Sequence, residues 1–369
     1  GQQSLSFTSP LLARILSSRG VLNADDLDHS LKGLLAPDSF LGIGEAATIL
    51  ADALESDSSI LIVGDFDADG ATSCTLMVTA LRAMGARQVN YLVPDRFKFG
   101  YGLTPEIVDV AVQFKPAVIV TVDNGIASVE GVAHANTLGI SVVVTDHHLP
   151  GHELPAAAAI VNPNQSGCEF PSKSLAGVGV AFYLLSVLRT ELRSRDWFAH
   201  HPEINLASFL DLVALGTVAD VVPMDQNNRR LVEEGIRRIR GGHCRPGLKA
   251  MLLAAGVNPQ HLTTRDLAFS IAPRLNAAGR LQDMSIGIEC LLADEVRAVE
   301  LAEHLDALNN ERKEIETDMR DIALAHLKQL SLDEETAAGL CFYRPDWHQG
   351  VVGIVASRIK EKSHRPVIA

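Results

Sequence analysis

The chain of 369 residues is 47% hydrophobic and 21% charged, and its formal net charge at pH 7 is −13. This composition excludes a disordered chain and leaves room for two folded domains, while the acidic charge argues against nucleic-acid binding. The chain has no apolar run of roughly 18 residues and no recognisable secretory signal, so we expect no membrane partner. Its five cysteines show no disulfide framework, which fits a reduced, cytoplasmic setting.

The first half of the chain alternates between strand and helix patterns, after an N-terminal helical segment (1–59) to which we assign no chemistry. The expected strands are 60–63, 89–93, 117–122 and 140–145, and the expected helices between them are 72–84 and 105–114. The last two strand runs are continuous and β-branched, as in parallel strands buried on both faces. The order of elements predicts an α/β fold with a doubly wound parallel sheet.

The second half is mainly helical and ends in a new α/β pattern. The expected helices are 175–193, 205–219, 227–240, 246–255, 264–271 and a long charged helix at 294–330 that ends near 331–333. A strand at 338–343, a helix at 351–360 and a strand at 366–368 follow. We therefore predict a catalytic domain with a helical portion (60–293), a connecting helix (294–333) and the beginning of a second, truncated α/β domain (334–369).

Polar clusters follow the expected strands at the end where a parallel sheet binds its ligand. Asp65, Asp67 and Asp69 follow the first strand, Asp123 follows the third, and the stretch 146–148 (Asp-His-His) follows the fourth. Since the carboxyl ends of parallel strands meet at one edge, the sequence predicts that these side chains converge there.

The spacing of the first cluster favours a metal centre. In extended backbone, alternate side chains share a face, so Asp65, Asp67 and Asp69 would repel one another without a cation. Carboxylates with imidazoles suit Mn²⁺ or Mg²⁺ better than zinc. The five cysteines, which stand far apart with no C-x-x-C pair, also argue against zinc and against a disulfide framework. The sequence offers ligands for two ions, and Asp123 could bridge them.

Each residue also has an ordinary structural interpretation. An aspartate after a strand, such as Asp123, commonly caps a turn or helix. Adjacent histidines such as His147 and His148 are often solvated loop residues. The joint occurrence of such clusters at successive strand ends favours the functional interpretation.

Several motifs resemble those of a known superfamily. The stretch Asp146-His147-His148 resembles the signature of the DHH phosphoesterases, and 64–70, 122–125 and 216–221 resemble their first, second and fourth motifs. Three further stretches, 94–103, 274–280 and 347–358, are similar to the RecJ exonuclease family within that superfamily. The resemblance extends from about residue 60 to the C-terminus. It implies that the C-terminal segment is the beginning of a DHHA1-type domain.

The resemblance implies the following metal ligands: Asp67, Asp69, Asp123, His147 and Asp220, with Asp65 in or beside the metal centre. It also implies that His148 lies close to the scissile phosphate and that Asp146 steadies the histidine pair. Many superfamily members have a histidine where this chain has Val63. We expect Asp65 to substitute for it.

Substrate contacts are also implied by the resemblance. Arg280 would bind a substrate phosphate as part of the catalytic site, since a guanidinium can contact phosphate through two hydrogen bonds. The other expected contacts are Arg96, Lys98, Tyr101, Arg274, Asn276 and His348. For Arg274, a structural salt bridge is an equal alternative. For Tyr101, a packing role is an alternative of at least equal weight.

The implied activity is metal-dependent 5′-to-3′ hydrolysis of single-stranded DNA to 5′-mononucleotides in DNA repair and recombination. Single-strand-binding protein and repair helicases are the implied protein partners. Two alternatives stay open: a phosphoesterase acting on short oligonucleotides or cyclic dinucleotides, and a catalytically silent DNA-binding scaffold. A dinucleotide-dependent dehydrogenase is disfavoured, because no G-x-G-x-x-G follows the first strand.

Overall fold

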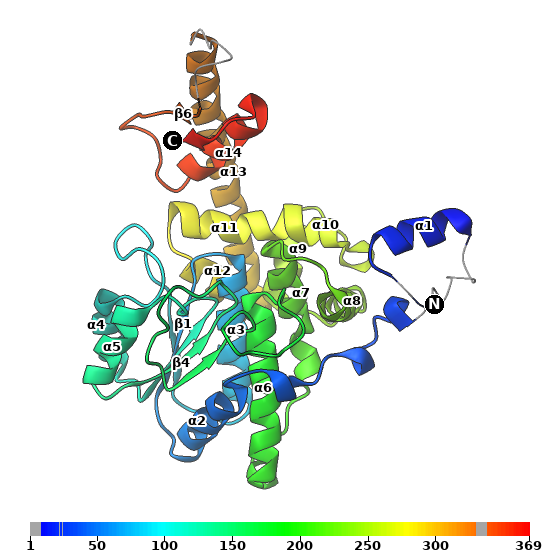
Figure 1. The fold of residues 1–369 in the computed structure, drawn as a ribbon, viewed down its shortest axis with the longest axis vertical. Coiled ribbons are helices and arrows are strands. Elements are labelled where there is room, and N and C mark those ends of the chain that lie inside the picture. The colour runs from blue at the N-terminus through cyan, green and yellow to red at the C-terminus, as the bar shows by residue number, and fades with distance from the viewer. Residues whose placement is uncertain (1–8, 22, 24, 330–337) are drawn as a thin grey trace.

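The computed structural model describes residues 9–21, 23, 25–329 and 338–369. Its centre is a parallel sheet in the order β2-β1-β3-β4-β5 (Figure 1). The strands are β1 (Ile60–Gly64), β2 (Val89–Leu92), β3 (Val118–Val122), β4 (Ser141–Thr145) and β5 (Ala159–Val161). The four predicted strands are thus confirmed, whereas β5 was not predicted.

Helices cover both faces of the sheet. On one face are α2 (Ile43–Glu55), α3 (Ala68–Ala83) and α6 (Gly177–Ser194), and on the other are α4 (Pro105–Ala111) and α5 (Val129–Thr137). Alternate strand residues supply the two cores: Ile60 and Ile62 pack with the first group of helices, and Leu61 and Val63 with the second. The predicted doubly wound sheet is confirmed, although α5 was not foreseen.

A helical layer packs beside α3 and α6 (Figure 1). Its helices are α7 (Leu210–Ala219), α8 (Gln226–Arg240), α9 (Pro246–Ala254), α10 (Thr264–Asp266), a π-helical turn (Leu267–Ile271), α11 (Ala272–Leu281) and α12 (Ser285–Leu292). The sequence analysis expected neither α11 nor α12. Pro273 interrupts the local pattern, but it lies in the first turn of α11, where a proline is tolerated because its missing N–H is not needed.

The long helix α13 (Glu295–Gln329) leads from this layer to the C-terminal segment. There, β6 (Leu340–Cys341) and β7 (Val367–Ile368) pair in parallel, and α14 (Val352–Ser363) follows β6. Apolar residues of α13 and α14 share a small core with β6. The expected helix end near 331–333 lies outside the described residues. The predicted domain boundaries stay predictions.

The N-terminal segment is partly helical, with α1 (Pro10–Ser18) and α2 among its described residues. In the described part of the chain, no single helix has both the length and the apolar character to cross a membrane. The helical stretches 31–39 and 43–55, bent at 91°, satisfy these criteria only as a pair.

Candidate metal centre

The predicted metal ligands come together at the carboxyl edge of the sheet, where the order of strands reverses between β1 and β3. Their side chains form three overlapping groups, and within each group the potential ligand atoms lie within 4.8 Å of one another. The groups are Asp65, Asp67 and Asp123; Asp69, His147 and Asp220; and Asp123, His147 and His148. All six predicted ligands therefore lie in one place, and Asp65 is among them.

The first turn of α3 holds two of these carboxylates. Asp67 is the N-cap of α3 and accepts a hydrogen bond from the Gly70 N–H at 2.9 Å. The buried Asp69 accepts hydrogen bonds from the N–H groups of Gly177 (2.6 Å) and Val178 (3.0 Å), at the beginning of α6. The positive end of α6 therefore offsets the charge of Asp69. The sequence analysis missed these backbone donors.

Asp123 and His147 face each other in the centre. Asp123 is 2% exposed and its φ of +62° is a left-handed conformation that is uncommon outside glycine. His147 Nε2 lies 3.1 Å from Asp123 Oδ1 and 3.4 Å from Asp220 Oδ2. Although these atoms are close, they are not aligned as hydrogen bonds, and none of the three has a hydrogen-bond partner among the described residues.

Buried polar atoms without partners are costly, and here three of them converge. A divalent cation would satisfy all three, because carboxylate oxygens and imidazole nitrogens are suitable ligands for Mn²⁺ and Mg²⁺. The residues present thus fit a metal ion.

The pKa values indicate the same electrostatic stress. Burial, together with neighbouring carboxylates, raises the pKa of Asp65 to about 8 and those of Asp69 and Asp220 to about 7. Burial and the nearby Asp69 raise the pKa of Asp123 well above its ordinary value. Burial lowers the pKa of His147, which favours the neutral imidazole that binds metals. Bound cations would relieve this crowding of negative charge.

His148 has a different environment from His147. Its Nδ1 lies 2.7 Å from Asp146 Oδ1, and this hydrogen bond raises the pKa of His148 to about 9. Asp146 is itself held by the N–H groups of Ile126, His147 and His148. The raised pKa favours the protonated imidazole in the metal-free chain, and Asp146 already engages Nδ1, which suits His148 to contact with a phosphate better than to metal ligation.

Two asparagines that the sequence analysis did not single out fix the backbone of the histidine pair. Asn162 Nδ2 donates to the His148 carbonyl at 2.9 Å, and Asn164 Nδ2 donates to the His147 carbonyl at 2.6 Å. No local pattern distinguishes such residues from ordinary turn formers.

The predicted substrate residues of α11 are bonded mainly to the protein. Arg274 pairs with Asp306 of α13 at 2.6 Å and is largely buried, which supports the structural alternative. Asn276 Oδ1 accepts a hydrogen bond from the Ala68 N–H at 2.8 Å. Arg280 Nη1 donates to the Gly350 carbonyl at 3.1 Å, and burial together with Arg96 and Arg312 lowers its pKa.

The predicted contacts in the loop after β2 lie between the centre and the C-terminal segment. The guanidinium of Arg96 stacks on the ring of Phe66 at 4.3 Å, and Phe97 meets His348 edge to face at 6.2 Å. Tyr101, 46% exposed, places its hydroxyl 3.3 Å from His148 Nδ1. Lys98 is exposed and pairs with Asp95.

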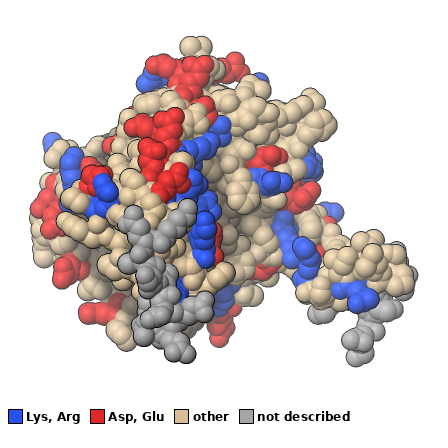
Figure 2. Space-filling view, turned by 90° about the horizontal axis from the view of Figure 1, so that it is seen from above, with Lys and Arg blue, Asp and Glu red and all other residues tan. Residues whose placement is uncertain are grey.

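The surface is not uniformly acidic. On the face seen in Figure 2, Lys and Arg side chains gather beside a patch of Asp and Glu. The objection raised by the net charge of −13 is therefore weaker locally than for the chain as a whole.

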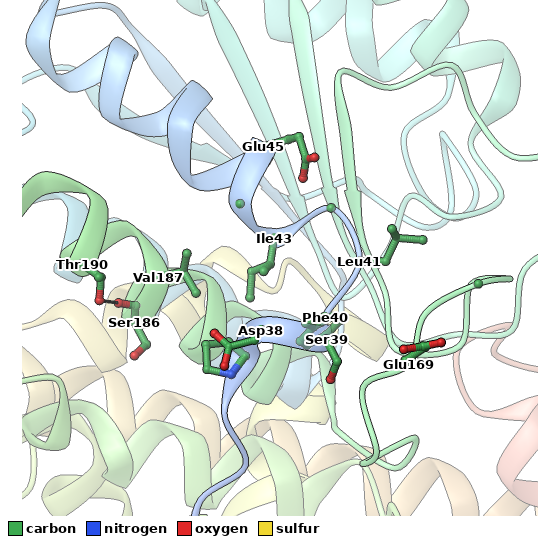
Figure 3. A pocket seen from close by; sticks show the side chains of 14 residues that line it. Asp38, Ser39, Phe40, Leu41, Ile43, Glu45, Glu169, Ser186, Val187 and Thr190 are labelled. Carbon is green, nitrogen blue, oxygen red and sulfur yellow. Dashed lines mark hydrogen bonds between the residues drawn. The ribbon is translucent and has the colours of Figure 1, made fainter. Parts of the chain in front are cut away.

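Two pockets differ in their relation to the centre. One of about 530 Å³ adjoins it and is lined by Tyr101, Asp146 and His148 together with the beginnings of α4 and α5. Another, of about 780 Å³, lies between the 37–45 segment and α6 (Figure 3). The second pocket is larger but contains none of the predicted site residues, so the chemistry of the centre does not involve it.

Comparison with known proteins agrees with this geometry. Residues 59–217 match the model of the DHH family, N-terminal domain. The chain is 58% identical over 364 residues to the single-stranded-DNA-specific exonuclease RecJ of Salmonella typhimurium and 57% identical to that of Escherichia coli. These matches cover 98% of this chain but 63% of each relative's length.

Solved structures show the same similarity. A crystal structure of exonuclease RecJ bound to manganese superposes with a TM-score of 0.79 at 36% identity, covering 90% of this chain and 80% of the other. RecJ from Thermus thermophilus in complex with Mn²⁺ gives a TM-score of 0.82 at 34% identity, covering 98% of this chain and 50% of the other.

Proposed function

Because this chain belongs to the RecJ family of DHH proteins, we propose that it is a metal-dependent exonuclease that hydrolyses single-stranded DNA. The observation that carries the proposal is the convergence of seven ligand-type side chains at the switch point of the sheet, in the three groups described above. Relatives of this chain are named single-stranded-DNA-specific exonucleases, and two have been solved with manganese.

The metal ligands in this proposal are Asp65, Asp67, Asp69, Asp123, His147 and Asp220. They would hold two Mn²⁺ or Mg²⁺ ions, and Asp123 belongs to two of the three ligand groups. When bound, such ions activate water and offset the charge that develops on the phosphate. Without bound metal, the N–H groups at the start of α6 already offset part of the charge of Asp69.

His148 and Arg280 would act on the phosphate itself. The imidazolium of His148, held by Asp146, can donate a hydrogen bond from Nε2 to a phosphate oxygen. The guanidinium of Arg280 interacts electrostatically with the predicted ligand Asp67, and it supplies a second cation. Together they would orient the scissile phosphate and stabilise negative charge in the transition state.

We also propose that hydrolysis proceeds in the 5′-to-3′ direction and releases 5′-mononucleotides, with Arg96, Lys98, Tyr101 and His348 lining the path of the strand. Single-strand-binding protein and repair helicases are the protein partners that we propose, and the cytoplasm is the compartment. The chain spans 63% of the length of its curated relatives. The activity proposed for this chain is therefore to be measured on this chain itself.

The experiment is hydrolysis of 5′-labelled single-stranded DNA with added Mn²⁺. The parent chain is compared with Asp123→Ala and with Asp109→Ala, which removes an exposed carboxylate paired with His134. We expect labelled mononucleotide from the parent and from Asp109→Ala, and a loss of at least about a thousandfold for Asp123→Ala. Duplex DNA should stay intact.

Other results would contradict the proposal in distinct ways. Release of longer labelled fragments first would reverse the proposed direction. Turnover of dinucleotides without turnover of long strands would favour the small-substrate phosphoesterase. Absence of both activities and of Mn²⁺ binding would favour the silent scaffold.

A further inference from the structure

Helix α11 contacts residues 66–68, here called the metal-binding turn because they include the predicted ligand Asp67, at two points. Asn276 Oδ1 accepts a hydrogen bond from the Ala68 N–H at 2.8 Å. Three residues later, Gly279 approaches the turn so closely that a Cβ at this position would lie 2.0 Å from the Phe66 carbonyl oxygen. Since Phe66 and Ala68 flank Asp67 in the sequence, α11 contacts both neighbours of this predicted ligand.

The hydrogen bond from the Ala68 N–H satisfies a donor at the beginning of α3. The first N–H groups of a helix have no acceptor within the helix. The Asp67 side chain accepts from Gly70, so it does not serve Ala68, which is buried. Asn276 supplies the missing acceptor from a distant part of the sequence.

The same turn determines where two carboxylates lie. Ala68 stands between Asp67 and Asp69, and each of these belongs to a group of potential ligands. If the Ala68 peptide lost its acceptor and rotated, both carboxylates would move with it. Substitution of residues that hold ligands in this way commonly costs about tenfold to a hundredfold in metal affinity.

We infer that Asn276 is a positioning residue that holds the metal-binding turn, instead of a contact to substrate. The inference rests on the proposed metal centre and revises the expectation from the sequence. Arg280 is on the same helix and bonds to Gly350. Helix α11 therefore fixes the distance between the centre and the guanidinium proposed to bind phosphate.

The test is titration calorimetry of the metal-free chain with Mn²⁺. Asn276→Ala removes the acceptor and should weaken Mn²⁺ binding about tenfold to a hundredfold. Asn276→Asp keeps an acceptor oxygen at the same position, and its added negative charge attracts cations, so it should bind Mn²⁺ at least as tightly as the parent. A substrate contact predicts the reverse pattern: unchanged Mn²⁺ affinity in both variants and weaker binding of single-stranded DNA in both.

The matched control is Asn258→Ala. Asn258 also caps a helical turn, with Oδ1 accepting from the Gln260 N–H at 3.0 Å, and it belongs to none of the ligand groups. Its substitution should leave Mn²⁺ affinity unchanged. If Asn276→Ala does not fold, Asn276→Gln moves the acceptor by one methylene and should still weaken Mn²⁺ binding.

The outcomes separate this inference from the proposed function. A parent chain that binds no Mn²⁺ overturns both. A parent that binds Mn²⁺ while Asn276→Ala binds it equally well overturns the inference alone.

Discussion

The two sides of the site are built differently. On the sheet side, the strand-end carboxylates Asp65, Asp123 and Asp146 are buried, and facing atoms of Asp123 and His147 have no hydrogen-bond partner among the described residues. On the helical side, Arg274, Asn276 and Arg280 are bonded to other parts of the protein. The sheet side thus has polar atoms available to bind a ligand. The polar side chains of the helical side are largely engaged in contacts with other segments of the protein. Substitutions on the two sides should therefore fail in different ways.

Among the further changes that test this comparison, the largest effect should come from filling the contact between α7 and α3. A Cβ at Gly216 would lie 2.2 Å from Thr72 Oγ1 and 2.7 Å from Asp69 Oδ1, in a buried region. We expect Gly216→Ala to lower the free energy of unfolding by about 1–3 kcal/mol. It should also weaken Mn²⁺ binding at least about tenfold, because Asp69 would be displaced.

Chemical denaturation and Mn²⁺ titration check this prediction. The control is Gly353→Ala, a helical glycine of α14 where a Cβ would meet nothing within 4 Å. This control should be neutral or slightly stabilising. Unchanged Mn²⁺ affinity in Gly216→Ala would show that Asp69 is not a metal ligand.

The next effect is a pH dependence that belongs to the sheet side. The pKa values of Asp65 (about 8), Asp69 and Asp220 (about 7) exceed those of an unfolded chain. Between about pH 4 and 8 the metal-free folded state therefore binds more protons than the unfolded state, and its stability falls as pH rises. Because Mn²⁺ displaces these protons, its affinity should increase at least about tenfold between pH 6 and 8.

Thermal unfolding and Mn²⁺ titration at several pH values measure both trends. Saturating Mn²⁺ should flatten the fall in stability. A Mn²⁺ affinity that is constant between pH 6 and 8 would show that the carboxylates are already ionised without metal.

A smaller effect is expected for Arg280, the helical-side residue proposed to contact phosphate. Arg280→Ala should lower kcat/KM for single-stranded DNA about tenfold, through both a higher KM and a lower kcat, as expected for the loss of a charge-assisted hydrogen bond, and leave Mn²⁺ affinity unchanged. Steady-state hydrolysis measures the first and calorimetry the second. Arg297→Ala, which removes an exposed arginine paired with Glu300, is the control and should change neither.

The smallest effect on activity is expected for Arg274. Its substitution by alanine leaves Asp306 without its partner and should cost about 1–2 kcal/mol of stability, less than a fully buried pair because Asp306 is partly exposed. Adding Asp306→Ala should recover part of the loss in denaturant unfolding. A raised KM at unchanged stability would instead return Arg274 to the substrate contacts.

The sheet side was largely predictable because its logic is local. Apolar runs indicate strands, parallel strands end at one edge, and Asp65, Asp123 and His147 follow such runs directly. Asp220 came only from the resemblance, since it closes α7 and looks like an ordinary helix end.

The helical side was less predictable because its contacts join distant residues. Asn276 bonds to Ala68 and Arg274 to Asp306, and neither pairing leaves a local pattern. Helix α11, with Pro273 and Gly279, has weak helical character of its own, and its glycine is explained only by the close approach to Phe66.

The position of Asp220 has a consequence during synthesis of the chain. The ligands at the ends of β1, β3 and β4 leave the ribosome early, whereas Asp220 follows α7 and Arg280 emerges later still. Chains generally fold from the N-terminus as they are made. A nascent chain would thus carry an incomplete centre until α7 packs on α3, and the centre would be complete only after most of this core has been translated.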